Sequence, residues 1–212
     1  MFELIISTAA VLFAAINPIG VASLFAILTR GTDRSHKIAM ANRSITVVAV
    51  VMLAFAFLGT AILEKMGISF AAFKLAGGLL LLITGINLVM DKGSDPHDDK
   101  DLMKKKSTDI AVFPIAIPMT AGPAALTSIV LYMEQAEGVF MNQAAVIGTM
   151  LALLLLVYVL MRSANWVEKV IGQNVINIIS RIMGVILSSL AFEFVLKGFQ
   201  DVGIIAADVV LG

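Results

Sequence analysis

The sequence contains no cysteine and only two histidines among its 212 residues. Disulfides, thiolate nucleophiles and cysteine-based zinc sites are therefore excluded. His36 and His97 both fall in polar stretches between apolar segments, so we expect from them neither a paired metal site nor an intramembrane proton relay. We accordingly expect no catalytic residues, no metal and no cofactor, because no nucleophile–base pair of the kind an enzyme needs can be found.

Charge of either sign is also scarce, and the two signs cancel. Fifteen Lys and Arg residues stand against fifteen Asp and Glu, charged residues make up 14% of the chain, and hydrophobic residues make up 59%. Soluble domains average roughly 25% charged and 45–50% apolar residues. With a mean hydropathy of +0.98, the composition indicates a protein that crosses a membrane several times. It offers no basic surface for nucleic acid.

Long apolar segments are present six times. A hydrocarbon core about 30 Å thick requires roughly 17–25 mostly apolar residues in a helix. The segments expected to span it are Leu4–Leu28, Ser44–Leu63, Phe70–Val89, Ile110–Met133, Ala144–Met161 and Ile176–Leu196. None alternates as a barrel strand would, so the predicted fold class is an all-α integral membrane protein. The start lacks a positively charged stretch, and we expect no cleaved signal.

Lysine and arginine are distributed unevenly over the connections between these segments. When the segments cross alternately, twelve of the fifteen fall on one side and only Lys65, Lys74 and Lys197 on the other. Because loops rich in Lys and Arg stay in the cytoplasm, the first, third and fifth connections are expected to be cytoplasmic. This predicts a multi-pass protein of the inner (cell) membrane with both termini outside.

The two halves of the chain resemble each other at a nearly constant spacing. Pro18–Leu24 aligns with Pro123–Ile129 at an offset of 105 residues, and Gly78 followed by Asn87 aligns with Gly184 followed by Glu193 at an offset of 106. We therefore expect two three-helix repeats, residues 1–95 and 109–212, joined by a cytoplasmic linker at 96–108. Because three is odd, the second repeat enters from the opposite side, which gives the inverted topology of many secondary transporters.

Two of the apolar segments are interrupted by proline and glycine. The first carries Asn17-Pro18-Ile19-Gly20, and the fourth carries Thr120-Ala121-Gly122-Pro123-Ala124. In a helix interior proline costs about 3 kcal/mol and glycine about 1, and backbone groups freed in hydrocarbon need partners inside the protein. We expect helices 1 and 4 to be discontinuous, with both breaks facing inward near the bilayer midplane. The alternative is that the prolines only kink packed helices.

The breaks predict a binding site for a small zwitterion. Half-helices starting near Gly20 and Ala124 would offer amide donors to a carboxylate, while unwound carbonyls and the Asn17 oxygen would suit an ammonium group. Residues that could frame the cavity or act as gates are Ser23, Thr84, Asn87, Thr127, Ser128, Ser188 and Glu193. For Ser23, Thr127 and Ser128 the alternative is a bond to the helix carbonyl four residues earlier. For Asn87 and Glu193 the alternative is that each lies near a helix end and reaches the lipid headgroups.

Three stretches are distinctive as they stand: Ile16-Asn17-Pro18-Ile19-Gly20, Phe73–Leu82 and Ala111–Pro123. Through them the chain resembles the MarC family of integral membrane proteins over essentially its whole length. The resemblance implies six helices in two inverted repeats, with discontinuous first and fourth helices. It also implies uptake of glycine and alanine driven by an ion gradient, with protons favoured over sodium. Where the family commonly has a second glycine after the proline, this chain has Ala124, whose methyl group narrows the approach to the backbone.

Together these observations predict a secondary transporter of small neutral amino acids whose partners are the lipid bilayer and a zwitterionic substrate. The resemblance assigns substrate binding to Asn17, Pro18, Ile19 and Gly20 and to the segment from Thr120 to Pro123. A proton would need Glu193, a peripheral carboxylate or bound water, because no acidic residue lies deep in an apolar segment, whereas sodium could be held by backbone carbonyls. The alternatives are a non-transporting scaffold or stress-related membrane protein, and a passive channel or exporter for another small solute.

Overall fold

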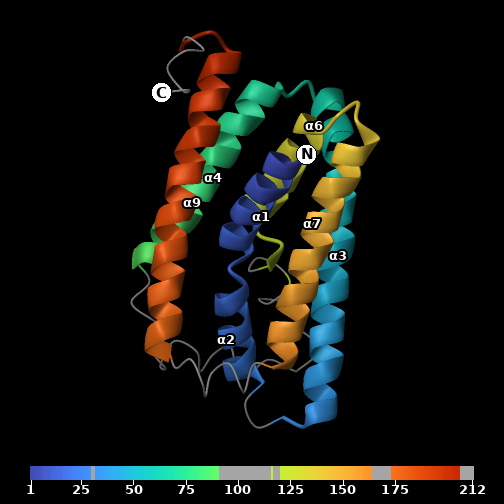
Figure 1. Ribbon diagram of the computed structural model, residues 1–212, viewed down its shortest axis with the longest axis vertical. Coiled ribbons are helices and arrows are strands. Elements are labelled where there is room, and N and C mark those ends of the chain that lie inside the picture. The colour runs from blue at the N-terminus through green and yellow to red at the C-terminus, as the bar shows by residue number, and fades with distance from the viewer. Residues whose placement is uncertain (30–31, 91–115, 117–119, 164–172, 206–212) are drawn as a thin grey trace.

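The structure is a computed structural model that describes residues 1–29, 32–90, 116, 120–163 and 173–205. As the sequence predicts, the elements within these ranges are helices. They are α1 (Phe2–Ile16), α2 (Pro18–Leu28), α3 (Arg34–Lys65), α4 (Phe70–Met90), α6 (Pro123–Gln135), α7 (Phe140–Arg162) and α9 (Gln173–Asp201). The helices lie alongside one another in an elongated bundle (Figure 1).

Five stretches of the described chain are long and apolar enough to cross a membrane. They are Phe2–Ala26, Arg34–Lys65, Phe70–Met90, Phe140–Arg162 and Val175–Asp201. Much of the expected fourth span, Ile110–Met133, lies outside the described residues, and α6 covers its second half. Large apolar side chains such as Phe57, Leu155 and Val185 are more than half exposed, as expected of faces that contact lipid. The chain is therefore an integral membrane protein with several spans.

The start of α3 differs from the prediction. The helix begins at Arg34 rather than at Ser44, so most of the connection expected at Arg30–Arg43 is helical. Hydropathy marks where a segment leaves hydrocarbon, but it does not mark where a helix ends, and Lys, Arg, Ala and Met all favour helix. At 1.5 Å per residue α3 is about 48 Å long against a core of about 30 Å. Its polar first turns therefore extend beyond the bilayer.

α7 and α9 also extend beyond their expected bounds for the same reason. α7 runs from Phe140 to Arg162 instead of from Ala144 to Met161, and α9 runs from Gln173 to Asp201 instead of from Ile176 to Leu196. The turn expected at Glu64–Ser69 is present between α3 and α4. The acidic and basic stretch at 91–109 and most of the connection before α9 lie outside the described residues.

The closest pair of helices is α4 and α9, which run antiparallel along one side of the bundle (Figure 1). Small residues recur every seventh position on both helices and are buried where the two meet. They are Ala71, Gly78 and Gly85 on α4 and Gly184, Ala191 and Gly198 on α9. A Cβ on Gly78 would lie 2.9 Å from the Ala191 carbonyl oxygen. Small residues let helix backbones approach this closely in membranes.

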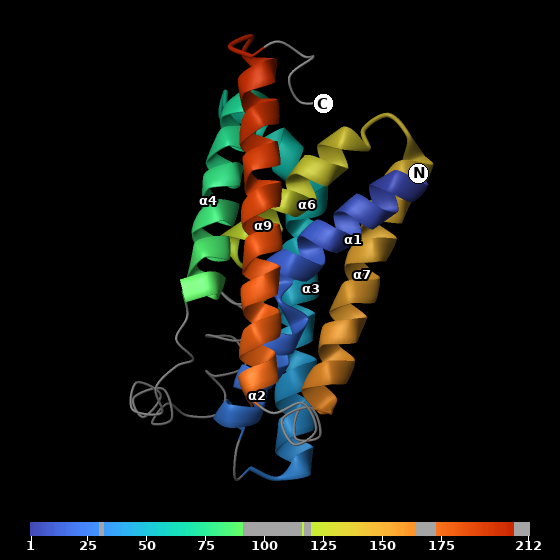
Figure 2. The same cartoon turned by 60° about the vertical axis from the view of Figure 1, so that its left-hand side comes forward.

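The other helices pack against partners that are distant in the sequence. α2 packs against α7 and α9, and α6 packs against α3 and α4. α1 lies against α6 and α7, and Figure 2 shows it inclined across the bundle. The N-terminal end of α1 and the C-terminal end of α9 lie at the same end of the molecule (Figure 1).

Candidate functional site

The first predicted break is present at Asn17. α1 ends at Ile16, α2 begins at Pro18, and Asn17 between them has φ 49° and ψ 67°, in the left-handed region. Among the described residues it is the one non-glycine residue with positive φ. Asparagine tolerates this conformation better than most residues, and Pro18 needs no N–H donor at the first position of α2. The discontinuity of helix 1 is thereby confirmed, and Figure 1 shows it well inside the bundle.

The side chain of Asn17 bonds in two directions. Its Oδ1 accepts the Gly20 N–H at 3.3 Å, which caps the first turn of α2. Its Nδ2 donates to the Ser180 hydroxyl of α9, also at 3.3 Å. A Cβ on Gly20 would lie 2.5 Å from Nδ2, so only glycine leaves room for the carboxamide. The Gly20 amide, which the sequence suggested for a substrate carboxylate, is thus already bonded within the chain.

The second predicted break precedes α6, which begins at Pro123 part-way along the bundle (Figure 2). Gly122 is extended, with φ −74° and ψ 168°, and the Ala121 N–H bonds the Ala116 carbonyl at 2.9 Å. Thr120 and Ala121 are each 1% exposed, whereas Pro123 is exposed despite its depth in the bundle. Irregular backbone here is enclosed by protein, as the hydrocarbon environment requires. Pro118 lies outside the described residues.

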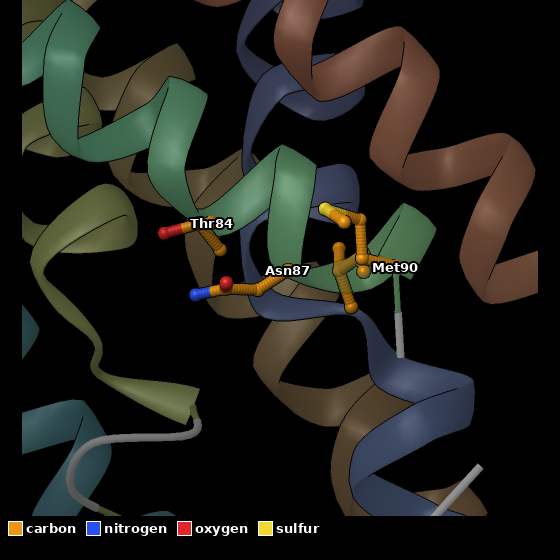
Figure 3. Close-up of a pocket in the computed structure, with 4 residues that line it drawn as sticks. Thr84, Asn87 and Met90 are labelled. Carbon is orange, nitrogen blue, oxygen red and sulfur yellow. The ribbon is translucent and has the colours of Figure 1, made fainter. Parts of the chain in front are cut away.

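A hollow of about 390 Å³ lies at the end of α4 and is lined there by Thr84, Asn87, Leu88 and Met90. Figure 3 shows the Thr84 hydroxyl and the Asn87 carboxamide extending from one side of α4, while Met90 extends from another. Thr84 and Asn87 thus lie at an open hollow near the end of α4, and their role in framing a substrate cavity stays a prediction.

Most of the other predicted hydroxyls are bonded to their own helices. Ser128 donates to the Ala124 carbonyl at 2.8 Å, Ser188 to the Gly184 carbonyl at 2.9 Å, and Thr84 to the Leu80 carbonyl at 2.8 Å. In each of these bonds the hydroxyl donates its one proton. Its oxygen can still accept a hydrogen bond, but the hydroxyl cannot donate to another group. Ser23 and Thr127 are each 5% exposed, and the methyl group of Thr127 packs against Gly77 of α4.

Glu193 is not near a helix end, which corrects the alternative considered from the sequence. α9 continues past it to Asp201, and its carboxylate pairs with Lys197 at 3.3 Å with 43% of its side chain exposed. At 1.5 Å per residue it lies about 20 Å from Ser180 along the helix. Glu193 therefore does not share a site with the Asn17 break.

Several polar residues escaped the sequence reasoning. Ser180 is one serine in a long apolar segment, and its contact with Asn17 depends on how two distant helices face each other. Thr8 is fully buried, and its hydroxyl has no hydrogen-bond partner in the described part of the chain. Lys74, which suggests a lipid-headgroup anchor by its position, instead pairs with Asp201 at 2.7 Å. Within the described ranges no cluster of residues could hold a metal ion.

Comparison with known proteins agrees with this architecture. The model of the MarC family of integral membrane proteins matches residues 2–202. The chain belongs to the MarC family. It is 34% identical to a UPF0056 membrane protein of Pyrococcus abyssi, with 89% of this chain and 90% of that protein covered. It is 30% identical to the UPF0056 membrane protein YhcE of Escherichia coli, with 90% and 89% covered. No solved structure gives a significant match.

Proposed function

We propose that this MarC family member is a secondary active transporter of small neutral amino acids such as glycine and alanine, and that it is not an enzyme. The observation that carries the proposal is the junction at Asn17, where a membrane helix is broken inside the bundle and its polar groups face protein. Helices broken at this depth hold substrates and coupling ions in many secondary transporters.

The junction suits a zwitterion because two helix ends meet there. The C-terminal end of α1 carries a partial negative charge and the N-terminal end of α2 a partial positive charge, and only Asn17 separates them. An α-amino acid carries its ammonium and carboxylate groups on one carbon atom, which matches this pair of opposite partial charges. Gly122 and Ala124 at the second break are small, which favours a substrate with a small side chain. The hollow at Thr84 and Asn87 is a candidate for the approach route.

The pairing of α4 with α9 supports an inverted-repeat arrangement. The offset of 106 residues converts Gly78 into Gly184 and Gly85 into Ala191. In the structure Gly78 meets Ala191 and Gly85 meets Gly184, so the small residues that match between the two halves lie at one shared antiparallel interface. Leu81 and Leu187 have the same offset, and both are fully buried. We assign the repeats to residues 1–95 and 109–212.

The same pairing indicates which parts would move during alternating access. Backbone contacts at three levels join α4 to α9, and the pair of Lys74 with Asp201 joins them again near one end. These two helices belong to different repeats, so sliding one whole repeat against the other would break this interface. We therefore propose that α4 and α9 move together relative to α1, α2, α3, α6 and α7.

We further propose an inner-membrane location with both termini outside. The start of α3, the end of α7 and the start of α9 lie at the same end of the bundle (Figure 1). Basic residues in these helix ends are Arg34, Lys37, Arg43 and Arg162. Since lysine and arginine favour the cytoplasmic side, this end is assigned to the cytoplasm.

The experiment that tests the proposal is uptake of radiolabelled glycine into proteoliposomes under an imposed pH gradient and, separately, a sodium gradient. Accumulation under one gradient that disappears when the gradient is collapsed supports a coupled carrier and identifies the ion; we propose protons. Equilibration without saturation or counterflow indicates a channel. No movement of glycine or of competing amino acids by folded protein would overturn the proposal and favour a scaffold. The Ser189→Ala protein is the matched control, since Ser189 is exposed and bonds its own helix.

A further inference from the structure

The three serines in α9 differ in how their hydroxyls are bonded. Ser188 and Ser189 donate to the carbonyls of Gly184 and Val185, at 2.9 and 3.1 Å. This is the usual way for a serine to satisfy itself within an apolar helix. Ser180 instead accepts a hydrogen bond from Asn17 Nδ2, 163 positions away in the chain. Its hydroxyl therefore contributes to tertiary structure at the broken helix.

The bonding at Asn17 determines which way its carboxamide faces. A carboxamide has one acceptor end and one donor end. The Gly20 N–H requires an acceptor, so Oδ1 faces α2 and Nδ2 faces α9. Ser180 supplies the acceptor that Nδ2 needs in this orientation. Without that hydroxyl, Nδ2 would lose its partner and the carboxamide would be free to rotate away from the α2 cap.

Ser180 also forms a contact between two parts of the bundle, the broken helix and the pair of α4 with α9. Asn17 belongs to the broken helix formed by α1 and α2, and Ser180 belongs to α9, which packs tightly on α4. The bond between them joins the predicted binding junction to this helix pair. Both side chains are partly buried, so water competes less for the bond than it would at the surface.

We propose that Ser180 is a positioning residue for substrate binding, holding the Asn17 carboxamide in the orientation in which the α1–α2 junction receives a small amino acid. This inference rests on the proposed transport function. It predicts that loss of the hydroxyl weakens substrate binding more than it slows the transport cycle. A purely structural role predicts a loss of folded protein with unchanged affinity.

The test compares Ser180→Ala, Ser180→Thr and the control Ser189→Ala by glycine uptake in proteoliposomes, with KM and Vmax measured separately. We expect Ser180→Ala to raise KM about tenfold, the scale of one lost hydrogen bond, with Vmax within about twofold. Ser180→Thr keeps a hydroxyl and should recover most of the affinity, and Ser189→Ala should match the unmodified protein. A KM for Ser180→Ala within twofold of the unmodified protein would overturn the proposal.

A second readout does not depend on transport. Thermal unfolding of Asn17→Ala, Ser180→Ala and the double variant forms a cycle, and we expect the two losses in Tm not to add, because each variant removes the same hydrogen bond. Additive losses would overturn the positioning role. Absence of uptake by the unmodified protein would overturn the proposed function instead, and the cycle would still decide whether Ser180 positions Asn17.

Discussion

Gly85 of α4 and Gly184 of α9 face each other backbone to backbone. A Cβ on Gly85 would lie 2.8 Å from the Gly184 carbonyl oxygen, and a Cβ on Gly184 would lie 2.6 Å from the Gly85 carbonyl oxygen. Both distances are shorter than a real Cβ contact allows, and the obstructing atom belongs to a helix backbone that cannot rotate away. The approach of the two helices is therefore limited by these two residues.

Gly184→Ala should destabilise the protein by about 1–3 kcal/mol, because α4 and α9 must separate to admit the methyl group. The control is Gly148→Ala in α7, where a Cβ would meet nothing within 4 Å. That change should be neutral or stabilising by up to about 1 kcal/mol, since alanine favours helix. Thermal unfolding in detergent or lipid nanodiscs measures both. Equal melting temperatures for the two variants would contradict the packing described here.

Replacing Asn17 should separate the role of its backbone from the role of its side chain. Asn17→Gly keeps the left-handed conformation but loses the cap and the bond to Ser180, so the protein should fold and lose glycine uptake. Asn17→Ala loses the same contacts and also forces an alanine into the left-handed backbone conformation, which costs about 1–2 kcal/mol. Its Tm should be lower than that of Asn17→Gly. The prediction fails if the glycine variant transports normally.

Gly20→Ala should reduce uptake at least tenfold while leaving the fold intact. The new Cβ would lie 2.5 Å from Asn17 Nδ2 and 2.9 Å from Asn17 Cγ, so the carboxamide must leave its place over α2. Alanine improves helix propensity by about 1 kcal/mol, which offsets part of the loss of the cap. We expect a Tm close to that of the unmodified protein. Uptake unchanged in the folded variant would show that the carboxamide orientation is not needed.

Cysteine pairs can test which helices move, because the chain has no native cysteine to interfere. Leu75→Cys with Gly198→Cys joins α4 to α9, where a Cβ on Gly198 would lie 2.8 Å from Leu75 Cγ. Gly77→Cys with Thr127→Cys joins α4 to α6, where a Cβ on Gly77 would lie 3.3 Å from Thr127 Cβ. Both pairs are close enough for a disulfide.

Oxidation of the pair between α4 and α9 should leave uptake largely intact, because these helices are proposed to move together. Oxidation of the pair between α4 and α6 should block uptake, and reduction should restore it. Gel mobility after cleavage between the two sites reports whether each disulfide has formed. Loss of uptake on cross-linking α4 to α9 would refute movement of the two as one body.

The ion pair of Lys74 with Asp201 should contribute modestly to stability. The atoms are 2.7 Å apart, with 19% of the lysine side chain and 40% of the aspartate side chain exposed. We expect Asp201→Asn to cost at most about 1 kcal/mol, less at high salt. Exchanging the charges in the double variant Lys74→Asp with Asp201→Lys should recover part of the lost stability. Thermal unfolding at low and high salt measures the effect. The comparison is Glu193→Gln, which removes the exposed pair of Glu193 with Lys197.

The parts of the fold that follow from local sequence were predictable. Apolar length predicts the spans, and Asn17-Pro18 predicts the break because proline cannot continue a helix whatever surrounds it. The beginning of α3 at Arg34 was not predictable in this way, since hydropathy reports the thickness of the bilayer rather than the length of the helix.

Contacts between distant helices could not be predicted, because they depend on how each helix is rotated. Ser180 and Ser189 look alike in sequence, yet only one of them meets Asn17. The pairing of Lys74 with Asp201 also requires the register of α4 against α9, which the spacing of small residues constrains but does not determine.

The single residue between α1 and α2 makes this part of the molecule a joint with one pivot. Any change in the angle between the two half-helices must be absorbed by the φ and ψ of Asn17, which its own side chain restrains through Gly20 and Ser180. α1 lies against α6, α7 and α9, while α2 lies against α7 and α9. The two half-helices are thus held by partly different neighbours, and a tilt of one need not be transmitted to the other.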